Sequence, residues 1–501
     1  MAVVSLIGSA AFAAMAVPFG RGKIERPSRN ITCGDGVPGV DHAYGDLGPY
    51  IANVGTTAAC CAHCQANPRC VAWVLETDSH LCFLKAVTSG QSCPPQGGVP
   101  CKRNMSNRIS MAGCPDGPPP PPPPPPPKHW LPVQTLSAPY RNWSYYMGDY
   151  GGFVVPPNAG NFAGQTLTDT PFVFEKTPED SLPGRYRMTY LWFNGTKGAN
   201  GYEVGLATSD DLLHWTFGKG GAAGLVFTRN PTPGTYDYGG VTIGGMLLTS
   251  SNTTAPRILE KVNGKYWALY GCYPSRAGYE AGDGGQGIAS SIDGVTWARV
   301  SDTIPIAPGG SSALPPWESR TVYEPFVVAV NGTLWDFYNA AGINEFGAPA
   351  EETGLQTLPV AQLPGIDVAG NRSMWVQHPS TPLLPSGPPG TPDTKMASDP
   401  KVFYDTNQSV WICLYVCLGD STGGHADICI AFSTDLIHWD KDETPLYRAG
   451  GHPAGIDAEH AHKVSLAYDA DGVGYLYYTA VGSKGRGIAL ITSKDKNSAS
   501  M

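Results

Sequence analysis

The sequence lacks an excess of basic residues, since 33 lysines and arginines stand against 42 aspartates and glutamates and the net charge is −9. A protein that binds nucleic acid through its phosphates needs the opposite balance, so a nucleic-acid partner is not expected. Charged residues make up only 15% of the chain, far below the content of a coiled coil. The sequence also lacks any run of 18 uncharged apolar residues, and we therefore expect no membrane span.

What the chain has in abundance is glycine and proline, with 62 and 47 residues among 501. This composition is typical of a turn-rich globular protein, and the length predicts two or more domains. The 13 cysteines are unevenly placed, because nine fall in the first quarter of the chain. Such a density predicts a small disulfide scaffold whose pairing the spacing leaves open. The nine are Cys33, Cys60, Cys61, Cys64, Cys70, Cys82, Cys93, Cys101 and Cys114.

The chain begins with features of a secreted protein. Residues 1–16 are apolar and rich in small side chains, and they end in Ala14-Met15-Ala16, a pattern suited to signal peptidase. A basic start is missing, which leaves a disordered N-terminus as the alternative. Eight Asn-x-Ser/Thr acceptors, more than chance would provide, predict an extracellular glycoprotein. They begin at Asn30, Asn104, Asn142, Asn194, Asn252, Asn331, Asn371 and Asn407.

Residues 118–127 are an unbroken run of prolines. Such a run adopts the polyproline II conformation, with about 3.1 Å per residue, so residues 115–128 are predicted to be a stiff linker between two folded units. Proline-rich runs also bind aromatic grooves of partner proteins, but a spacer suits a secreted chain better.

The cysteines ahead of the linker follow a known spacing. Cys60-Cys61-Ala62-His63-Cys64 is followed by Cys70 with Trp73, and then by Cys82-Phe83-Leu84-Lys85. This pattern resembles the PAN/apple domain and covers residues 31–114. The resemblance implies a helix that its cysteines staple to a small sheet, in a module that binds a glycan or a protein. A zinc site is the alternative use of clustered cysteines, but the paired CxxC pattern that it needs is missing.

After the linker the sequence repeats itself, which predicts the architecture. A Gly-apolar-Ala phrase recurs in five copies, two of them degenerate, and in three copies an Asp and a Trp follow shortly after. Upstream of each phrase, β-branched and aromatic runs alternate with turn residues, as in a meander. Five units of four strands predict an all-β fold, a five-bladed β-propeller over residues 129–501. The Asp and Trp pairs are Asp211 and Trp215, Asp293 and Trp297, and Asp435 and Trp439.

The repeats also predict local structure. We expect the Asp of each pair to cap its turn through the backbone and the Trp to pack between blades. The fifth copy stops at Ser493, before any Asp and Trp, so its outermost strand is missing. We expect the tyrosine-rich segment 143–155, which precedes the first repeat, to supply that strand.

The repeats resemble those of the five-bladed propeller glycosidases, the superfamily of arabinanases, β-xylosidases, arabinofuranosidases, invertases and levansucrases. The phrases from Gly205 to Trp215 and from Ala431 to Trp439 carry the resemblance. It implies a secreted glycoside hydrolase that cleaves a wall or storage polysaccharide, with arabinan or xylan favoured, and that requires no cofactor. In this superfamily the catalytic carboxylates lie at the beginnings of the innermost strands, around the mouth of the central channel.

Prolines that precede apolar runs locate these beginnings and align Asp169, Ala255, Glu324, Asp399 and His462 from the five repeats. The resemblance implies that Asp169 is the ionised base or nucleophile and Glu324 the acid. Asp399 would orient the acid or raise its pKa. Repeat two has Arg257 where family members carry an aspartate, so Asp237, in the loop ahead of it, is a substitute candidate for the missing acid.

Further residues are predicted to contact the sugar. They are Arg257, Trp192, Tyr236, His462 and Arg486. His462 also resembles a channel histidine that holds a central calcium ion or its water in related propellers, and it implies a structural Ca²⁺ here. The alternative for His462 is an ordinary hydrogen-bonded structural role.

Two other functions compete with the hydrolase. A catalytically silent, lectin-like adhesive protein would use both domains to bind glycans, and Arg257 in place of the family aspartate favours it. The carboxylates Asp169, Glu324 and Asp399 at matched positions favour the enzyme. A sialidase would need six blades and an arginine triad, but only five repeats can be counted.

Overall fold

The computed structural model divides into two compact units, one ending at Lys128 and the other beginning at His129. The structure describes residues 37–42, 57–66, 72–76, 81–85, 102–112, 131–157, 166–194, 201–217, 224–276, 283–301, 315–363, 374–378 and 382–494. The predicted signal peptide, the linker and the cysteines Cys33, Cys70, Cys93, Cys101 and Cys114 lie outside these residues, as does the side chain of Cys61.

The first unit combines a helix with an antiparallel sheet. Its elements are β1 (Val37–His42), α1 (Thr57–Ala66), β2 (Ala72–Glu76), β3 (Leu81–Lys85) and β4 (Lys102–Ala112), and the sheet order is β1-β4-β2-β3. A disulfide joins Cys60 of α1 to Cys82 of β3, and Cys64, one turn further along α1, is disulfide-bonded as well. This helix stapled to a small sheet is the arrangement that the resemblance to the PAN/apple domain implies.

The second unit is built from antiparallel strands in one recurring pattern. An inner strand pairs with a second strand, the second with a third, and the third with a short fourth; we call each such meander a repeat. The described residues form five repeats. Repeat one contains β6 (Thr166–Glu175), β7 (Tyr186–Asn194), β8 (Tyr202–Ser209) and β9 (Thr216–Phe217), and repeat two contains β11 (Gly240–Met246), β13 (Lys265–Tyr273), β14 (Gly285–Ser291) and β15 (Ala298–Arg299). Repeat three contains β16 (Thr321–Val330), β17 (Thr333–Ile343), β18 (Pro349–Pro359) and β19 (Val376–Gln377), repeat four contains β20 (Met396–Asp405), β21 (Val410–Leu418), β22 (Ala426–Ser433) and β23 (Asp440–Lys441), and repeat five contains β24 (His460–Tyr468), β25 (Gly474–Gly482), β26 (Gly485–Thr492) and β5 (Ser144–Tyr145).

Short elements complete this unit. β10 (Leu225–Phe227) pairs with β8 and β12 (Lys261–Val262) with β13. The short helices are α2 (Val133–Ser137) and the 3₁₀ turns η1 (Ala138–Tyr140), η2 (Pro316–Glu318) and η5 (Asp420–Thr422).

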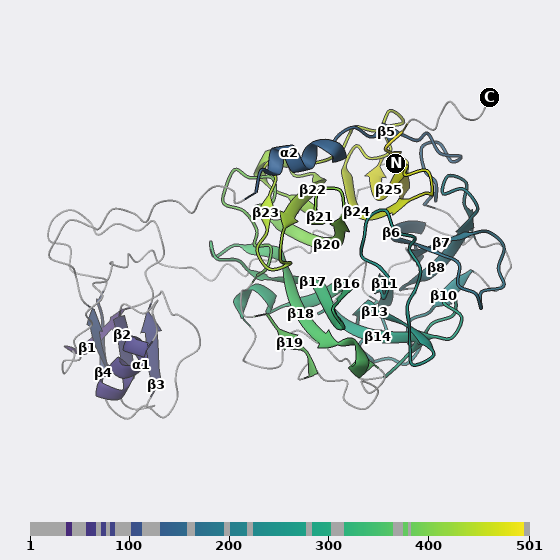
Figure 1. Cartoon of the computed structure of the whole chain (residues 1–501). Coiled ribbons are helices and arrows are strands. Elements are labelled where there is room, and N and C mark those ends of the chain that lie inside the picture. Colours follow the sequence, from purple (N-terminus) through teal and green to yellow (C-terminus); the bar gives the residue numbers. More distant parts are fainter. Residues whose placement is uncertain are drawn as a thin grey trace, which may run out of the picture. The chain divides into compact units, whose positions relative to one another are not determined.

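The inner strands lie side by side around an axis, along which Figure 1 looks. β6 contacts β11, β11 contacts β16, β16 contacts β20, β20 contacts β24, and β24 returns to β6. The third strand of one repeat also forms a parallel bridge to the inner strand of the next, at Tyr202 and Gly240, at Glu351 and Met396, and at Ala426 and His460. The beginnings of the inner strands of different repeats therefore meet near one another.

The segment before repeat one supplies the fourth strand of repeat five. β5 pairs antiparallel with β26, with Ser144 opposite Thr492 and Tyr145 opposite Ile491. Further along, the backbone N–H of Val154 donates to Ile488 O at 2.8 Å. The expectation that segment 143–155 provides the missing strand is confirmed, and it fastens the two ends of the unit together.

Glycines recur in the third strands because they face tyrosines. Gly205 pairs with Tyr190, Gly287 with Tyr270, and Gly354 with Tyr338. A Cβ atom on any of these glycines would approach the tyrosine ring to 2.6 Å or less. The recurring Gly-apolar-Ala phrase therefore has a steric cause, the space that the ring of the second strand needs.

The Asp and Trp pairs act as the sequence predicts. Asp211 Oδ1 accepts the backbone N–H groups of Leu213 and His214, each at 2.9 Å, and the equivalent aspartates of the other two turns do the same. Trp215 is buried against Tyr477 of repeat five, with ring centroids 5.7 Å apart. The aspartate caps a turn, and this tryptophan packs between repeats.

Repeat four contains a disulfide that was not predicted from the sequence, between Cys417 of β21 and Cys429 of β22. Cys417 pairs with Asp427 and Cys429 with Tyr415, so the two cysteines are diagonal neighbours on one face. Cross-strand disulfides of this kind are typical of an oxidising compartment.

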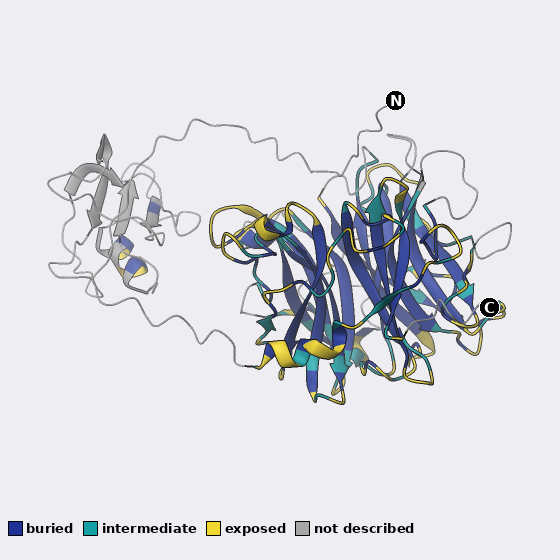
Figure 2. Cartoon of the chain, turned by 90° about the horizontal axis from the view of Figure 1, so that it is seen from above, coloured by how far each residue is buried: buried dark blue, intermediate teal, exposed yellow. Residues whose placement is uncertain are grey.

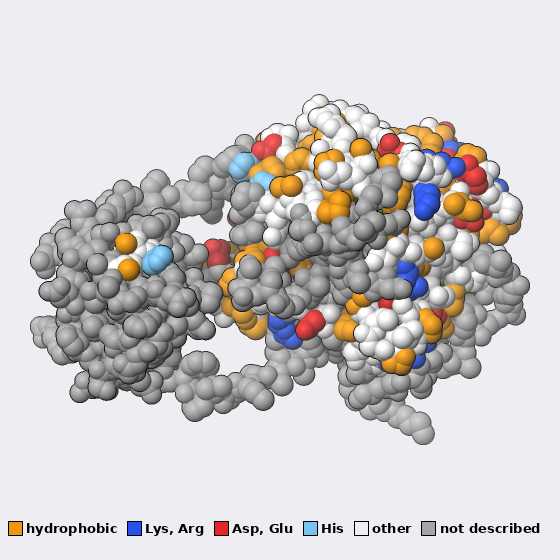
Figure 3. Space-filling model, turned by 90° about the horizontal axis from the view of Figure 1, so that it is seen from below, with side chains coloured by type: hydrophobic (Ala, Val, Ile, Leu, Met, Phe, Trp, Pro, Cys, Tyr) orange, Lys and Arg blue, Asp and Glu red, His pale blue; other side chains and the backbone are white. Residues whose placement is uncertain are grey.

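Burial follows the strands. In Figure 2 buried residues fill the strands and exposed residues gather in the connecting loops. On the face in Figure 3, acidic and basic side chains of the described residues are interspersed. Among the helices that the structure describes, none is long and apolar enough to cross a membrane.

Candidate active site

Each inner strand is interrupted by a β-bulge. The pairing register shifts between Asp169 and Phe172 in β6 and at corresponding places in β11, β16, β20 and β24. In four of these strands the bulge holds a non-glycine residue in the left-handed region, with φ between 43° and 51°. These residues are Thr170, Glu324, Asp399 and Lys463. Bulges re-aim side chains, and backbone strain of this kind is found at functional sites.

The bulges correct the alignment that the prolines predict. The inner strand of repeat two is β11, with Gly244 at its bulge, and Ala255 and Arg257 lie beyond its end. In repeat five the bulge residue is Lys463, and His462 precedes it, as Asp169 precedes the bulge residue Thr170 in repeat one. Asp169 therefore aligns with His462, and not with Glu324 and Asp399 as the sequence predicts. A proline follows the bulge residue in repeats one, three and four but not in repeats two and five, so prolines cannot align all five.

Charged side chains from four repeats meet at these bulges. Lys463 Nζ lies 3.7 Å from Asp169 Oδ2 and 3.9 Å from Glu324 Oε1. Arg486, at the start of β26, donates to the same oxygen of Asp169. Lys401 of β20 interacts electrostatically with Asp399, Glu324 and Lys463. We call Asp169, Glu324, Asp399, Lys401, Lys463 and Arg486 the inner cluster; it unites three predicted carboxylates with the predicted Arg486.

Asp169 is held in its ionised form. The side chain is fully buried, and burial would raise its pKa, but the charges of Arg486 and Lys463 outweigh that effect and hold the pKa of Asp169 well below its ordinary value. Thr479 Oγ1 donates to Asp169 Oδ1 at 2.6 Å, and the backbone N–H of Thr170 donates at 2.7 Å. A preorganised, ionised carboxylate is suited to act as a base or a nucleophile.

Glu324 is fully buried too, and the neighbouring repeat leaves space for it. A Cβ atom on Gly244 would lie 2.5 Å from Pro325 O and 3.3 Å from Glu324 Oε2. Only glycine at this position of β11 admits the bulge of β16 and its carboxylate. Burial favours the protonated form of a carboxyl group, the form that a general acid needs, whereas the ammonium of Lys463, 3.9 Å away, favours the ionised form.

Asp399 occupies the equivalent bulge of repeat four and is 5% exposed. Its backbone N–H donates to the side-chain oxygen of Asn339, a fully buried residue of β17 in repeat three. This bond fixes the bulge of one inner strand to the adjacent repeat.

Lys401 is a residue of the inner cluster that sequence reasoning missed. Its ammonium group lies 5.4 Å from the ring centroid of Phe326. Burial lowers the pKa of Lys401, although the charges of Asp399 and Glu324 oppose the shift. A lysine inside a buried strand is rare unless it is paired, so lysines at positions 401 and 463 of apolar strands were the available signal.

The histidines beside the inner cluster are uncharged at neutral pH. Burial, assisted by the charge of Arg486, lowers the pKa of His462 well below its ordinary value. Burial likewise lowers the pKa of His460 to about 4, and its Nδ1 accepts the backbone N–H of Ala426 at 2.8 Å.

The inner cluster does not fit the calcium ion that the family resemblance implies. A cation in the channel would need the carboxylates of Asp169 and Glu324, but the ammonium of Lys463 already contacts both. His462 is flanked by Lys463 and lies in the field of Arg486, which repels a further cation. Within the described ranges, no group of three or more His, Cys, Asp and Glu is arranged for a metal.

Arg257 lies away from the inner cluster. Its guanidinium stacks 4.9 Å from the Phe172 ring and 5.6 Å from the Phe403 ring, and its Nε donates to Val173 O at 2.5 Å. Burial lowers the pKa of Arg257 to about 9. These contacts place Arg257 nearer the far ends of β6 and β20, so it does not replace a carboxylate at their beginnings.

Three more predicted residues are placed elsewhere. Asp237 is fully buried and paired at 2.5 Å with Arg299 of β15, the fourth strand of repeat two. The hydroxyl of Tyr236 bonds to Tyr270 and to Ser301 O. Trp192 is packed in a buried cluster between repeats one and five. None of these contacts joins them to the inner cluster.

Asp237 belongs to a second set of carboxylates, which we call the outer carboxylates. Each lies three residues before an inner strand, is buried, and is bound by groups on the outer strands or loops. The set comprises Asp237 with Arg299; Glu318 with Tyr338 at 3.0 Å and Gln377 at 2.6 Å; Asp393 with Tyr415 at 3.3 Å and Lys441 at 2.6 Å; and Asp457 with Tyr447 at 2.5 Å and Tyr478 at 3.1 Å. They anchor the loops that lead into β11, β16, β20 and β24.

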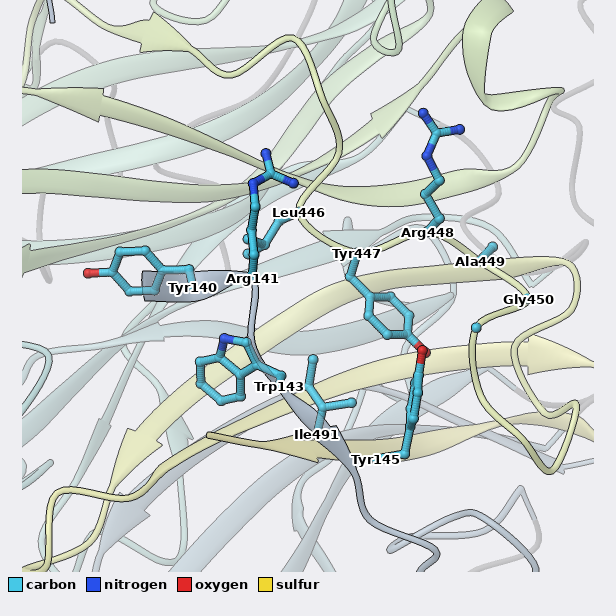
Figure 4. Close-up of a pocket in the computed structure, with 11 residues that line it drawn as sticks. Tyr140, Arg141, Trp143, Tyr145, Leu446, Tyr447, Arg448, Ala449, Gly450 and Ile491 are labelled. Carbon is cyan, nitrogen blue, oxygen red and sulfur yellow. The ribbon is translucent and has the colours of Figure 1, made fainter. Parts of the chain in front are cut away.

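A cavity of about 340 Å³ lies at the seam where β5 meets repeat five. Figure 4 shows Trp143 and Tyr145 on either side of Ile491. Two polar side chains of its wall are engaged, since Arg141 bonds to Asp442 at 2.7 Å and the Tyr447 hydroxyl bonds to Asp457. No carboxylate of the described residues lines this cavity, so it offers no acid and base pair.

Comparisons with known proteins bear on each unit. Residues 40–85 match the family model of the PAN domain, as the cysteine spacing predicts. No curated protein matches the chain.

Solved structures resemble the chain over most of its length. One, described as a complex of BT0996 with RGII, is 24% identical, with a TM-score of 0.56 over 73% of this chain and 95% of that one. Another, described as "Glycoside hydrolase", is 22% identical, with a TM-score of 0.57 over 73% and 96%. The chain therefore contains a PAN domain segment and shares its larger fold with these structures, in agreement with the predicted glycosidase-type propeller.

Proposed function

We propose that this protein is a secreted glycoside hydrolase that cleaves a wall or storage polysaccharide by two-carboxylate acid and base catalysis. The observation that carries the proposal is the inner cluster, in which buried carboxylates from three repeats converge with basic side chains at the beginnings of the inner strands. Burying so many charges is costly, and clusters of this kind with perturbed pKa values mark active sites.

In this proposal the five repeats are the blades of a closed five-bladed propeller over residues 129–501. Residues 1–16 are its signal peptide, residues 31–114 a PAN/apple-like domain, and residues 115–128 a rigid linker. The PAN/apple-like domain binds a glycan or a protein and brings the propeller to insoluble material.

The two catalytic roles follow from the two environments. Asp169, bonded by Arg486 and contacted by Lys463, is the ionised base or nucleophile. Glu324 is the acid, because full burial and the apolar neighbours Tyr323 and Phe326 favour its protonated form. Groups whose environments push their pKa values apart divide the acid and base work between them.

Other residues support these two. Asp399 orients the acid, and Arg486 and His462 border the cluster and contact the substrate. Arg257, Trp192, Tyr236 and Asp237 have no part in the chemistry, because their side chains are packed in other regions.

An arabinan or xylan type of substrate is favoured by the family resemblance. The fold neighbour named as a complex with RGII supports an oligosaccharide as the ligand of this fold. The test is release of reducing sugar from arabinans, xylans, fructans and mannans by the full chain, with Asp169→Asn as the inactive control. Release from one of these classes by the wild type alone supports the proposal.

Repeat two favours a second candidate, a catalytically silent glycan-binding protein, because β11 contributes no carboxylate to the cluster. If the wild type releases no reducing sugar from any of these polysaccharides but binds on a glycan array, that alternative is established and the hydrolase is overturned.

A further inference from the structure

Lys463 has an unusual position in the molecule. It lies on β24 of repeat five, yet its ammonium contacts Asp169 of repeat one at 3.7 Å and Glu324 of repeat three at 3.9 Å. One side chain thus links both proposed catalytic carboxylates, which come from different parts of the ring.

The backbone holds this side chain in place. Lys463 is the bulge residue of its strand, equivalent to Glu324 and Asp399, and its φ of 51° lies in the left-handed region. It is 6% exposed. A non-glycine residue persists in this conformation only where its surroundings fix it, so the repeat architecture directs Lys463 inward as it directs Glu324 and Asp399.

Charge balance explains why a cation is needed here. Two buried carboxylates near one another repel unless a positive charge lies between them or one of them is neutral. The inner cluster sets its three carboxyl groups, of which Glu324 carries a proton in its role as the acid, against the three basic side chains Lys401, Lys463 and Arg486. A divalent ion would add positive charge to a group that is not negative overall, at a place that the lysine fills.

We propose that Lys463 is a built-in cation that replaces a channel metal ion. Its ammonium group bridges Asp169 and Glu324 and keeps both carboxylates in position, so the reaction needs no bound metal. The proposal rests on the proposed function of the inner cluster, but the bridge itself can be tested without turnover.

The experiment compares two variants of the full chain. Lys463→Ala removes the ammonium and opens a space between the carboxylates, whereas Lys463→Met removes the charge and fills the space. We expect each variant to lose at least about tenfold in kcat/KM. Ethylammonium at tens of millimolar should restore activity at least about fivefold in Lys463→Ala and have no effect in Lys463→Met, because only the first has room for it.

Thermal unfolding provides the readout that is independent of activity. Ethylammonium should raise the Tm of Lys463→Ala by at least about 1 °C and should leave the Tm of Lys463→Met and of the wild type unchanged. The wild-type Tm should be the same in EDTA and in millimolar Ca²⁺.

Two results would overturn the bridge. One is a wild type that EDTA destabilises and Ca²⁺ restores; the other is a Lys463→Ala variant whose Tm does not respond to ethylammonium. A wild type without turnover on any glycan, combined with the expected Tm response, would refute the hydrolase and leave the bridge standing.

Discussion

The inner cluster and the outer carboxylates are two sets of buried acids that lie close together in the sequence. In repeats three and four, Glu318 and Asp393 precede Glu324 and Asp399 by six residues. The outer carboxylates are bound by groups of their own repeat or of the loop before it, as Asp393 is by Tyr415 and Lys441 of repeat four. The inner carboxylates are bound across repeats, as Asp169 of repeat one is by side chains of repeat five.

This difference separates structural acids from candidate catalytic ones. An outer carboxylate is bound by groups of its own repeat or of the loop before it, and it anchors that loop. An inner carboxylate shares its cation with a second carboxylate, so its environment exists only when the ring of repeats is assembled. A buried acid at a strand start is therefore a weak signal until its partners are known.

The largest effect is expected from neutralising an acid of the inner cluster. Asp169→Asn and Glu324→Gln should each reduce the rate on the natural substrate by at least about a hundredfold, the scale of one acid or base contribution, while the chain stays folded. The measurements are kcat/KM and the circular dichroism spectrum. Full activity of either variant would remove that residue from the mechanism.

The leaving group distinguishes the two roles. An aryl glycoside with a good leaving group needs no proton, so it should partly rescue Glu324→Gln and should not rescue Asp169→Asn. Equal rescue of both variants would contradict the assignment of acid and base.

Asp237→Asn is the matched control, because Asp237 and Asp169 are both fully buried and both bonded to an arginine. We expect this variant to lose about 2 kcal/mol of unfolding free energy, since Arg299 loses its charged acceptor, and to keep its activity within about twofold. Denaturant unfolding and kcat/KM measure the two effects. A hundredfold loss of activity at unchanged stability would return Asp237 to the catalytic set.

The pH dependence of the unfolding free energy tests whether the partners of Asp169 hold it in its ionised form. Because its pKa is lower in the folded protein than in the unfolded chain, its contribution is present above about pH 4 and is lost as the pH falls below that value. In denaturant unfolding at about pH 6, the unfolding free energy of the wild type should exceed that of Asp169→Asn by at least about 1 kcal/mol. This difference in unfolding free energy should become smaller toward about pH 3. A gap that is constant between these pH values would show that Asp169 is not held ionised by its partners.

The smallest effect is expected from removing the first unit. A chain that begins at Lys128 should hydrolyse a short soluble oligosaccharide within about twofold of the full-length rate, because the inner cluster and its described partners all lie after His129. Binding to insoluble polysaccharide should decrease. Lost turnover on the short substrate would show that the two units cooperate in catalysis.

Local pattern made much of the fold predictable. The cysteine spacing, the repeated phrases and the capping aspartates depend on contacts within the first unit or within one repeat. The segment that supplies the missing strand of repeat five was predictable because β26 is the one strand edge that its repeat leaves for it to pair with. The disulfide between Cys417 and Cys429 escaped prediction, because two cysteines twelve residues apart become neighbours only through the register of β21 and β22.

Local sequence patterns predict the repeats, the acids near the beginnings of the inner strands, and the segment that supplies the fourth strand of repeat five, because strand periodicity, turn residues and steric needs such as those of Gly205 are local properties. The tertiary structure decided which acids act together. Asp169 and Arg486 lie 317 residues apart in the chain and meet only when repeat five packs against repeat one. The bulges then decided that Lys463, and not His462, takes the place equivalent to Glu324, because a one-residue shift in register turns a different side chain toward the axis.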